Sequence, residues 1–175
     1  MERQNESLAQ KKTWSKMTEE EQQAVRENWK HTLPEKFDVF CCKKDWEIKD
    51  DLHIPGNLYV KYNLLSPKRI VNVHVDENLF IDGSITVGAI TVGNDFLVGN
   101  DVDAIRNVNV NGNFYINGFL NIYHLVVHGN LLVNESIDSL SIDVDGLFYC
   151  YDVYSHTFEI RASDYACTLC ENDFC

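Results

Sequence analysis

The chain has 175 residues, of which 45% are hydrophobic, so it holds enough apolar material for one domain with a continuous core. Its formal net charge is -12, and the imbalance lies in residues 51–175, which carry 5 Lys and Arg against 16 Asp and Glu, whereas residues 1–50 carry 10 against 11. A surface this acidic repels nucleic-acid phosphate and anionic lipid, which argues against direct binding to nucleic acid or membrane and favours basic protein partners.

The sequence has no run of about 18 apolar residues and no signal-peptide pattern, so we expect an intracellular, cytoplasmic protein. In that compartment the six cysteines are expected to be thiols rather than disulfides. The motifs G-x-G-x-x-G, P-loop, G-x-S-x-G and H-E-x-x-H do not occur, and we expect no cofactor.

The N-terminal segment, residues 1–51, differs in character from the rest of the chain. It begins as a polar arm, and then Thr18 and Glu21 form a capping box. This signal predicts a helix from about Glu19 to His31, which Pro34 ends. We expect this segment to cap the repeats that begin at Leu52, because the open end of a stack of strands needs a cover.

We expect a solenoid domain over residues 52–160, because one unit of about 17 residues repeats six times between Leu52 and Tyr154, as in VNVNGNFYINGFL and LVVHGNLLVNESI. One residue of each unit, which we call the anchor, sets the register at separations of 21, 17, 18, 17 and 17 residues: Asn57, Asn78, Asp95, Asn113, Asn130 and Leu147. Almost all residues five and three before the anchor, and one, three and seven after it, are aliphatic or aromatic. Pairs of columns two residues apart indicate strands, three of them in each unit.

A unit this short cannot bury its own apolar face, so the copies must stack at the strand spacing of ~4.8 Å. The sequence therefore predicts an all-β fold, a parallel β-solenoid (β-helix) of about six coils of ~17 residues with an N-terminal α-helical capping segment. A β-sandwich or an antiparallel meander would alternate without this identity of columns. Asn, Asp and Gly crowd at the expected bends, as in Asn111–Gly112, where we expect positive φ.

One outward position of the predicted solenoid is apolar in every repeat. It lies two residues after the anchor, and its members form a row that we call the apolar ladder: Tyr59, Phe80, Leu97, Tyr115, Leu132 and Tyr149. An exposed row of this kind usually marks a surface that something covers. The cover can be the N-terminal helix or the tail after Ser155, a second copy in a homo-oligomer, or a target protein. We predict these six residues as partner-binding residues, because stacked aromatic side chains are good interface anchors.

The C-terminal tail, residues 161–175, places Cys167, Cys170 and Cys175 at C-x2-C-x4-C. A CxxC pair is a common half of a zinc site, but zinc generally takes four ligands, and His156 is the one additional candidate nearby. We therefore predict no metal site.

The histidines and acidic residues form no catalytic arrangement in the sequence. His53 and His74 are expected to point outward on adjacent coils, and acidic pairs such as Asp101 and Asp103 fall at turn-rich positions typical of solvated corners. We therefore predict that the protein is not an enzyme.

Coils of 17 to 18 residues with columns of Val, Ile and Leu resemble the bactofilin-type, polymer-forming β-solenoids over residues 52–154. The resemblance implies a self-assembling structural protein. The chain departs from that family in its Trp-bearing helical segment and its Cys-rich end. The spacing of the strands also resembles the left-handed hexapeptide acyltransferases, which prefer a small residue at the first inward position of each strand. Here that position holds Leu, Ile, Val or Phe, so an acyltransferase is the weaker alternative.

These features together predict a non-enzymatic interaction protein. It would present its acidic surface and its apolar ladder to a protein partner, which we expect to be basic or nucleic-acid-binding. A compact acidic chain without catalytic groups would suit an inhibitor or effector, for example a phage or mobile-element anti-defence protein that occupies the basic groove of a nucleic-acid-binding enzyme. The alternative is a self-assembling, bactofilin-like protein, and a hexapeptide-like acyltransferase ranks behind it.

Overall fold

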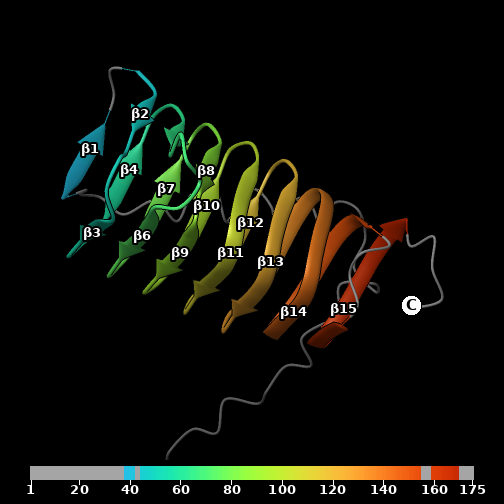
Figure 1. The fold of residues 1–175 in the computed structure, drawn as a ribbon. Helices are drawn as coiled ribbons and strands as arrows, with labels where there is room; N and C mark the ends of the chain where they lie inside the picture. Colours follow the sequence, from blue (N-terminus) through green and yellow to red (C-terminus); the bar gives the residue numbers. More distant parts are fainter. Residues whose placement is uncertain (1–37, 42–43, 155–158, 170–175) are drawn as a thin grey trace, which may run out of the picture.

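The computed structural model describes residues 38–41, 44–154 and 159–169, which form an all-β parallel solenoid of about seven turns. Figure 1 shows the strands stacked along one axis, from β1 and β3 at one end to β15 at the other. The predicted solenoid class is confirmed. The described residues contain no helix, and the capping helix predicted over Glu19–His31 lies outside them.

Each turn contributes strands to three faces, within which all pairings of the described strands are parallel. The first face contains β3 (Leu52–Ile54), β6 (Asn72–Val75), β9 (Ala89–Val92) and the later parts of β11 (Val102–Val110) and β13 (Leu120–Val127). The second face contains β1 (Val39–Cys41), β4 (Leu58–Val60), β7 (Leu79–Ile81), β10 (Phe96–Val98) and β12 (Phe114–Ile116). The third face contains β2 (Trp46–Glu47), β5 (Leu64–Leu65), β8 (Ile85–Val87) and the first parts of β11 and β13.

The last strands, β14 (Leu131–Val153) and β15 (Glu159–Leu169), run around the corners without a break. In β14, Leu131–Val133 pair with β12 on the second face. Ile137–Ser139 and Ser141–Val144 pair with the two parts of β13, and Leu147–Cys150 pair with β15. One strand therefore supplies a rung to all three faces.

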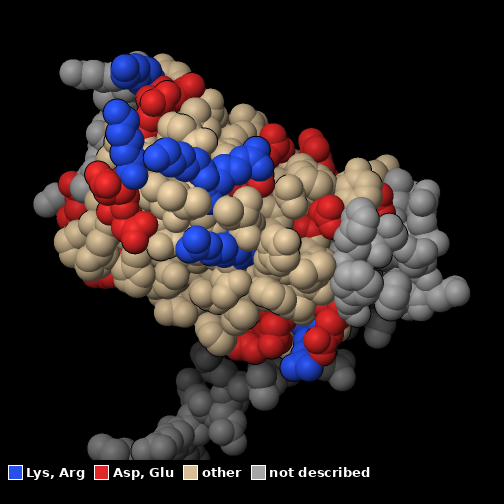
Figure 2. All heavy atoms as spheres, viewed as in Figure 1, with Lys and Arg blue, Asp and Glu red and all other residues tan. Residues whose placement is uncertain are grey.

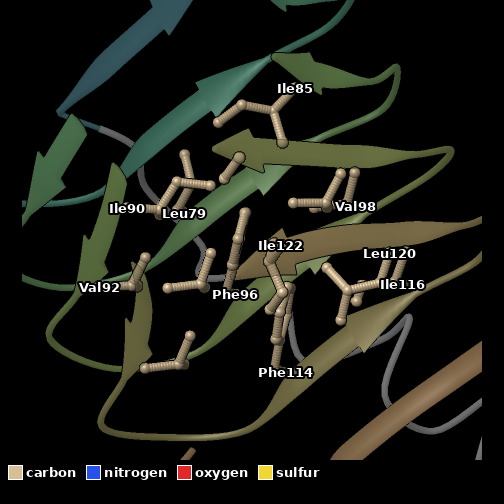
Figure 3. Close-up of a cluster of buried hydrophobic side chains, with 14 of the residues drawn as sticks. Leu79, Ile85, Ile90, Val92, Phe96, Val98, Phe114, Ile116, Leu120 and Ile122 are labelled. Carbon is tan, nitrogen blue, oxygen red and sulfur yellow. The ribbon is translucent and has the colours of Figure 1, made fainter. Parts of the chain in front are cut away.

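The interior of the solenoid is filled by the predicted inward columns, which reach the axis from all three faces (Figure 3). Phe96 and Phe114, from successive turns, stack with ring centroids 4.5 Å apart and 6° between their planes. Both rings are fully buried. Burying a side chain of this size stabilises the fold by about 1.5–3 kcal/mol. Stacking like residues on like residues thus lets each turn bury the face of the one before it.

The anchor residues form a hydrogen-bonded row along one corner, which we call the polar ladder. Asp38 takes the equivalent position one turn before the first anchor and extends the row. At each step a side-chain oxygen of one residue in the row accepts a hydrogen bond from the backbone N–H of the next: Asp38 from Asn57 (2.9 Å), Asn57 from Asn78 (3.3 Å), Asn78 from Asp95 (3.0 Å), Asp95 from Asn113 (2.7 Å), Asn113 from Asn130 (3.1 Å) and Asn130 from Leu147 (2.9 Å). Asn and Asp recur at this position because a corner N–H turned away from the strand pairing needs another acceptor.

The glycines at the corners have a different role from the one expected from the sequence. None of the described glycines has positive φ, and the described non-glycine residue that does is Arg69, at 51°. Instead, successive turns pass too close for a side chain. A Cβ on Gly93 would lie 1.8 Å from the carbonyl oxygen of Asp76, and one on Gly129 would lie 2.5 Å from that of Gly112. Close approach of the backbone, not left-handed φ, explains these glycines.

The solenoid extends past the range of 52–160 at which its repeats are recognisable. At the N-terminal end, β1 and β2 precede Leu52 and pair with β4 and β5. At the C-terminal end, β15 pairs with β14 as far as Leu169. These outer rungs are short or irregular in sequence, which hides them from a search for columns.

Candidate functional site: the apolar ladder of the second face

Parallel pairing places the members of the apolar ladder directly above one another. Tyr59 pairs with Phe80, Phe80 with Leu97, Leu97 with Tyr115, and Tyr115 with Leu132. Tyr149 packs with Tyr115 and Leu132 in one cluster, against which Leu97 and Leu147 also lie. All six residues predicted from the sequence therefore form one continuous row on the outer side of the second face.

Most of this row is buried, although it lies on the outer side of its strands. The exposed fraction is 2% for Phe80, 3% for Tyr115, 1% for Leu132 and 8% for Tyr149. The equivalent outward column of the first face is far more open, and its members are exposed or half-buried: His53, His74, Thr91, Asn109, Val126 and Asp143. The burial of these side chains is achieved within a single chain. The second face is therefore largely shielded from solvent within the chain, whereas the first face is not.

Two members in the N-terminal half of the ladder, Tyr59 and Leu97, are only half-buried, one on each side of the buried Phe80. A pocket of about 270 Å³ opens there, lined by Phe80, Ile81, Asp82, Leu97, Val98, Gly99, Tyr115 and Asn117. Leu97 is an aliphatic residue between two aromatic neighbours, Phe80 and Tyr115, so a hollow above it follows from the difference in side-chain size. The pocket has an apolar floor and a polar rim, as binding sites for a side chain or small molecule usually have.

Asp82 carries the negative charge on this rim. The hydroxyl of Tyr59 donates a hydrogen bond of 2.5 Å to the carboxylate of Asp82. Partial burial raises the pKa of Tyr59 to about 12, helped by that hydrogen bond and by the charge of Asp82. The raised pKa keeps the phenol neutral further into the alkaline range, and its hydrogen bond holds the carboxylate at the edge of the pocket.

A second set of hydrogen bonds fixes the other side of the rim. The side-chain amide of Asn134 donates to the hydroxyl of Tyr115 (2.7 Å) and to Oδ1 of Asn117 (2.9 Å). The hydroxyl of Tyr115 lies 3.4 Å from the same Oδ1. The rim thus offers hydrogen-bonding groups whose positions are fixed by one another around an apolar floor.

Charge is distributed unevenly along the solenoid axis. Among the described residues, the Lys and Arg before residue 70 are Lys44, Lys49, Lys61, Lys68 and Arg69. Residues 70–154 hold one Arg against eleven Asp and Glu. Figure 2 shows the cationic groups on this side of the molecule gathered mostly toward the N-terminal turns. The middle and C-terminal turns therefore carry an excess of negative charge, which generates a negative electrostatic field.

Of the three tail cysteines, the structure describes Cys167. Cys167 lies on β15 in register with Cys150, half-buried against the core, and its Sγ is 3.6 Å from the carbonyl oxygen of Tyr151. Cys170 and Cys175 lie outside the described residues. Within residues 38–41, 44–154 and 159–169, a group with the composition of a metal site occurs elsewhere, at His53, His74 and Asp76.

The sequence predicted His53 and His74 outward on adjacent coils, and the structure confirms this, since the two residues pair across β3 and β6. The prediction missed Asp76, whose Oδ1 lies 2.8 Å from Nε2 of each imidazole. The hydrogen bond from His53 lowers the pKa of Asp76, and desolvation opposes it, with further lowering by His74. The sequence did contain a signal for this cluster: His74 and Asp76 form an H-x-D pattern, and the outward His53 lies in the preceding coil.

Comparison of the chain with protein-family models, with curated proteins and with solved structures found no match. The described part of the chain contains no helix with the length and apolar character needed to cross a bilayer.

Proposed function

We propose that this protein is a non-enzymatic interaction protein that binds a protein partner through the apolar ladder. The observation that carries the proposal is the ladder itself: six large side chains in register on an outward face, with a pocket of about 270 Å³ above Leu97. A hollow flanked by rigid aromatic side chains can take one anchor residue of a partner, and such anchors supply most of the binding energy of protein interfaces.

The burial of the ladder bears on where a partner can bind. Phe80, Tyr115 and Leu132 are already buried within the chain, whereas Tyr59 and Leu97 are half-buried. The N-terminal segment, which the sequence offered as one possible cover, lies outside the described residues. A partner would therefore bind first at the half-buried members, around the pocket above Leu97.

The chemistry of the rim favours a cationic partner. Asp82 stands at the edge of an apolar pocket, a combination that suits an Arg or Lys side chain, whose stem is apolar and whose head is charged. The acidic turns beyond Arg69 would steer such a partner toward the site. A nucleic-acid-binding enzyme, whose groove is basic, is the partner class that fits best, and the protein would act as its inhibitor or effector, for example as a phage or mobile-element anti-defence protein.

The alternative is self-assembly. The stack begins with β1 and ends with β15, and all its pairings between described strands are parallel, so head-to-tail addition of another copy would continue the same pattern. In that case the protein would sediment as large or polydisperse species, whereas the partner-binding proposal expects a small, defined species. An acyltransferase is a weaker proposal still, and a thermal shift caused by acyl-CoA would favour it.

The test replaces Leu97 and Tyr115 together by Ser. The matched control replaces Thr91 and Asn109 by Ser, at outward positions of the first face on the same two turns. Circular dichroism checks the fold of both variants. We expect the first variant to lose capture of the partner that co-purifies from the native source, while the control keeps it. Raised salt should mainly slow association. If the ladder variant is folded and binds and assembles like the control, the ladder is not the interface.

A further inference from the structure

Two imidazoles and one carboxylate converge on the first face, near the N-terminal end of the solenoid. His53 of β3 and His74 of β6 are directly paired outward residues, with ring centroids 4.9 Å apart and planes at 68°. Nε2 of each ring lies 2.8 Å from Oδ1 of Asp76. The three candidate ligand atoms all lie within 4.8 Å of one another.

The fold holds these groups in place through its backbone. The register of β3 and β6 fixes the two histidines one strand spacing apart. The N–H of Asp76 donates to the carbonyl oxygen of Ile54 (2.9 Å), and the next turn passes so close that Gly93 has no room for a Cβ beside Asp76. The carboxylate and both imidazoles are therefore set on strands and a tight corner rather than on a long loop, which favours a preorganised site.

We propose that His53, His74 and Asp76 bind one divalent transition-metal ion of the zinc class. Two imidazole nitrogens and one carboxylate oxygen suit zinc, cobalt, nickel or copper, whereas calcium and magnesium prefer oxygen ligands alone. Ligands at about 2.1 Å in a tetrahedral site stand roughly 3.4 Å apart. The separations of 2.8 Å between nitrogen and oxygen are therefore within small side-chain rotations of that geometry.

The site is open to solvent. The side chains of His53, His74 and Asp76 are 61%, 50% and 42% exposed. Three protein ligands with an accessible fourth position resemble a catalytic or bridging zinc site more than a closed structural one. The remaining position would be filled by water or by a donor atom of a binding partner. A bound metal ion would also link β3 to β6, because one ligand comes from β3 and the other two come from β6 and the corner after it.

The chain offers a matched control. His128 and Asp145 form an exposed pair of the same chemistry on successive turns, with Nδ1 and Oδ2 2.7 Å apart. Among the described residues, this pair has no third His, Cys, Asp or Glu close enough to complete a group of three potential metal ligands. A single histidine and carboxylate supply two ligands, so this pair should bind zinc far more weakly.

The test is isothermal titration of ZnCl2 into untagged, chelator-stripped protein. We expect one tight equivalent for the full chain. His53→Asn and His74→Asn should each raise the Kd at least tenfold, and the double variant should lose the equivalent, while His128→Asn should leave it unchanged. Zinc should raise the Tm of the wild type and of His128→Asn but not of the double variant. X-ray absorption should show nitrogen and oxygen ligands near 2.0–2.2 Å without sulfur near 2.3 Å.

Two results would overturn the proposal. One is the absence of a zinc equivalent in the wild-type titration. The other is an equivalent that survives with the same Kd in the double variant, which would place the ion elsewhere, for example on the cysteines. The single variants keep the test decisive should the double variant prove less stable, since each removes one exposed side chain.

Discussion

The polar ladder predicts a large effect for one small substitution, Asn113→Ala. Asn113 is half-buried at the corner before β12, in the middle of the row. Its Oδ1 accepts from the backbone N–H of Asn130 (3.1 Å) and from the side-chain amide of Asn130 (2.9 Å), and its own amide donates to Oδ1 of Asp95 (3.0 Å). The substitution removes all three hydrogen bonds and leaves a corner N–H without its acceptor.

Each such hydrogen bond contributes about 1 kcal/mol net, so the loss of three costs about 3 kcal/mol. This is a large part of the 5–15 kcal/mol by which an ordinary domain is stable. The matched control is Asn111→Ala, two residues away and exposed, which should change the free energy of unfolding by less than about 0.5 kcal/mol. Asn113→Asp keeps the acceptor oxygen but places a second carboxylate beside that of Asp95, so it should be destabilising at neutral pH and less so in acid.

Urea unfolding followed by circular dichroism measures the three variants against the wild type. The midpoints should differ while the slopes agree, because the substitution removes hydrogen bonds without changing the surface that unfolding exposes. Equal midpoints for Asn113→Ala and Asn111→Ala would refute the reasoning, since the polar ladder would then add nothing to stability beyond an exposed corner residue.

Two further predictions concern the register and the ladder. Val110→Asp buries a carboxyl group in the core, where keeping the group neutral at pH 7 costs about 4 kcal/mol and burying it without a hydrogen-bond partner costs about 1–3 kcal/mol more, so the variant should unfold. The adjacent, outward Asn109→Asp should leave the stability nearly unchanged. Comparable Tm values for the two variants would contradict the register. The pKa of Tyr59 is raised from 10.0 to about 12, so between these pH values the folded state keeps a proton that the unfolded state releases. The free energy of unfolding should therefore fall as the pH rises from 10 to 12. Tyr59→Phe should remove one tyrosinate transition near pH 12 from the ultraviolet titration.

Inward columns were predictable from the sequence because burial in a stacked coil tolerates only apolar side chains. Val92, Val110 and Val127 follow one another in register on the first face, as the spacing of their repeats required. The same columns did not reveal the chemistry of their own anchors. Asn57 and Asn78 were useful as markers of register, and the physical reason for their recurrence, an acceptor for the next corner N–H, emerges only when the turns are stacked.

Two features were beyond sequence reasoning for a different reason. The burial of Phe80 and Leu132 depends on what lies over the outward face, and an outward position has the same pattern whether it is covered or not. The contact of His53 with Asp76 joins residues 23 positions apart and depends on the coil length, which is 21 residues here, 19 in the preceding coil and 17 or 18 in the following ones. A search for a repeat of about 17 residues averages over these differences in coil length. The 21-residue coil is the one that brings Asp76 to His53 and His74.

The 21-residue coil also shows how the spacing of side chains on a face is kept when the coil length changes. The extra residues between Asn57 and Asn78 are confined to the corner after β5, where Arg69 adopts positive φ and its guanidinium reaches Asp103 at 2.9 Å. On either side of this corner the pairing is regular, with Leu65 opposite Thr86 and Asn72 opposite Ala89. Corners therefore absorb insertions while faces keep their register, because a slipped face would turn its apolar side chains outward. Both the apolar ladder and the histidine pair lie on faces, where the fold fixes the spacing of neighbouring side chains.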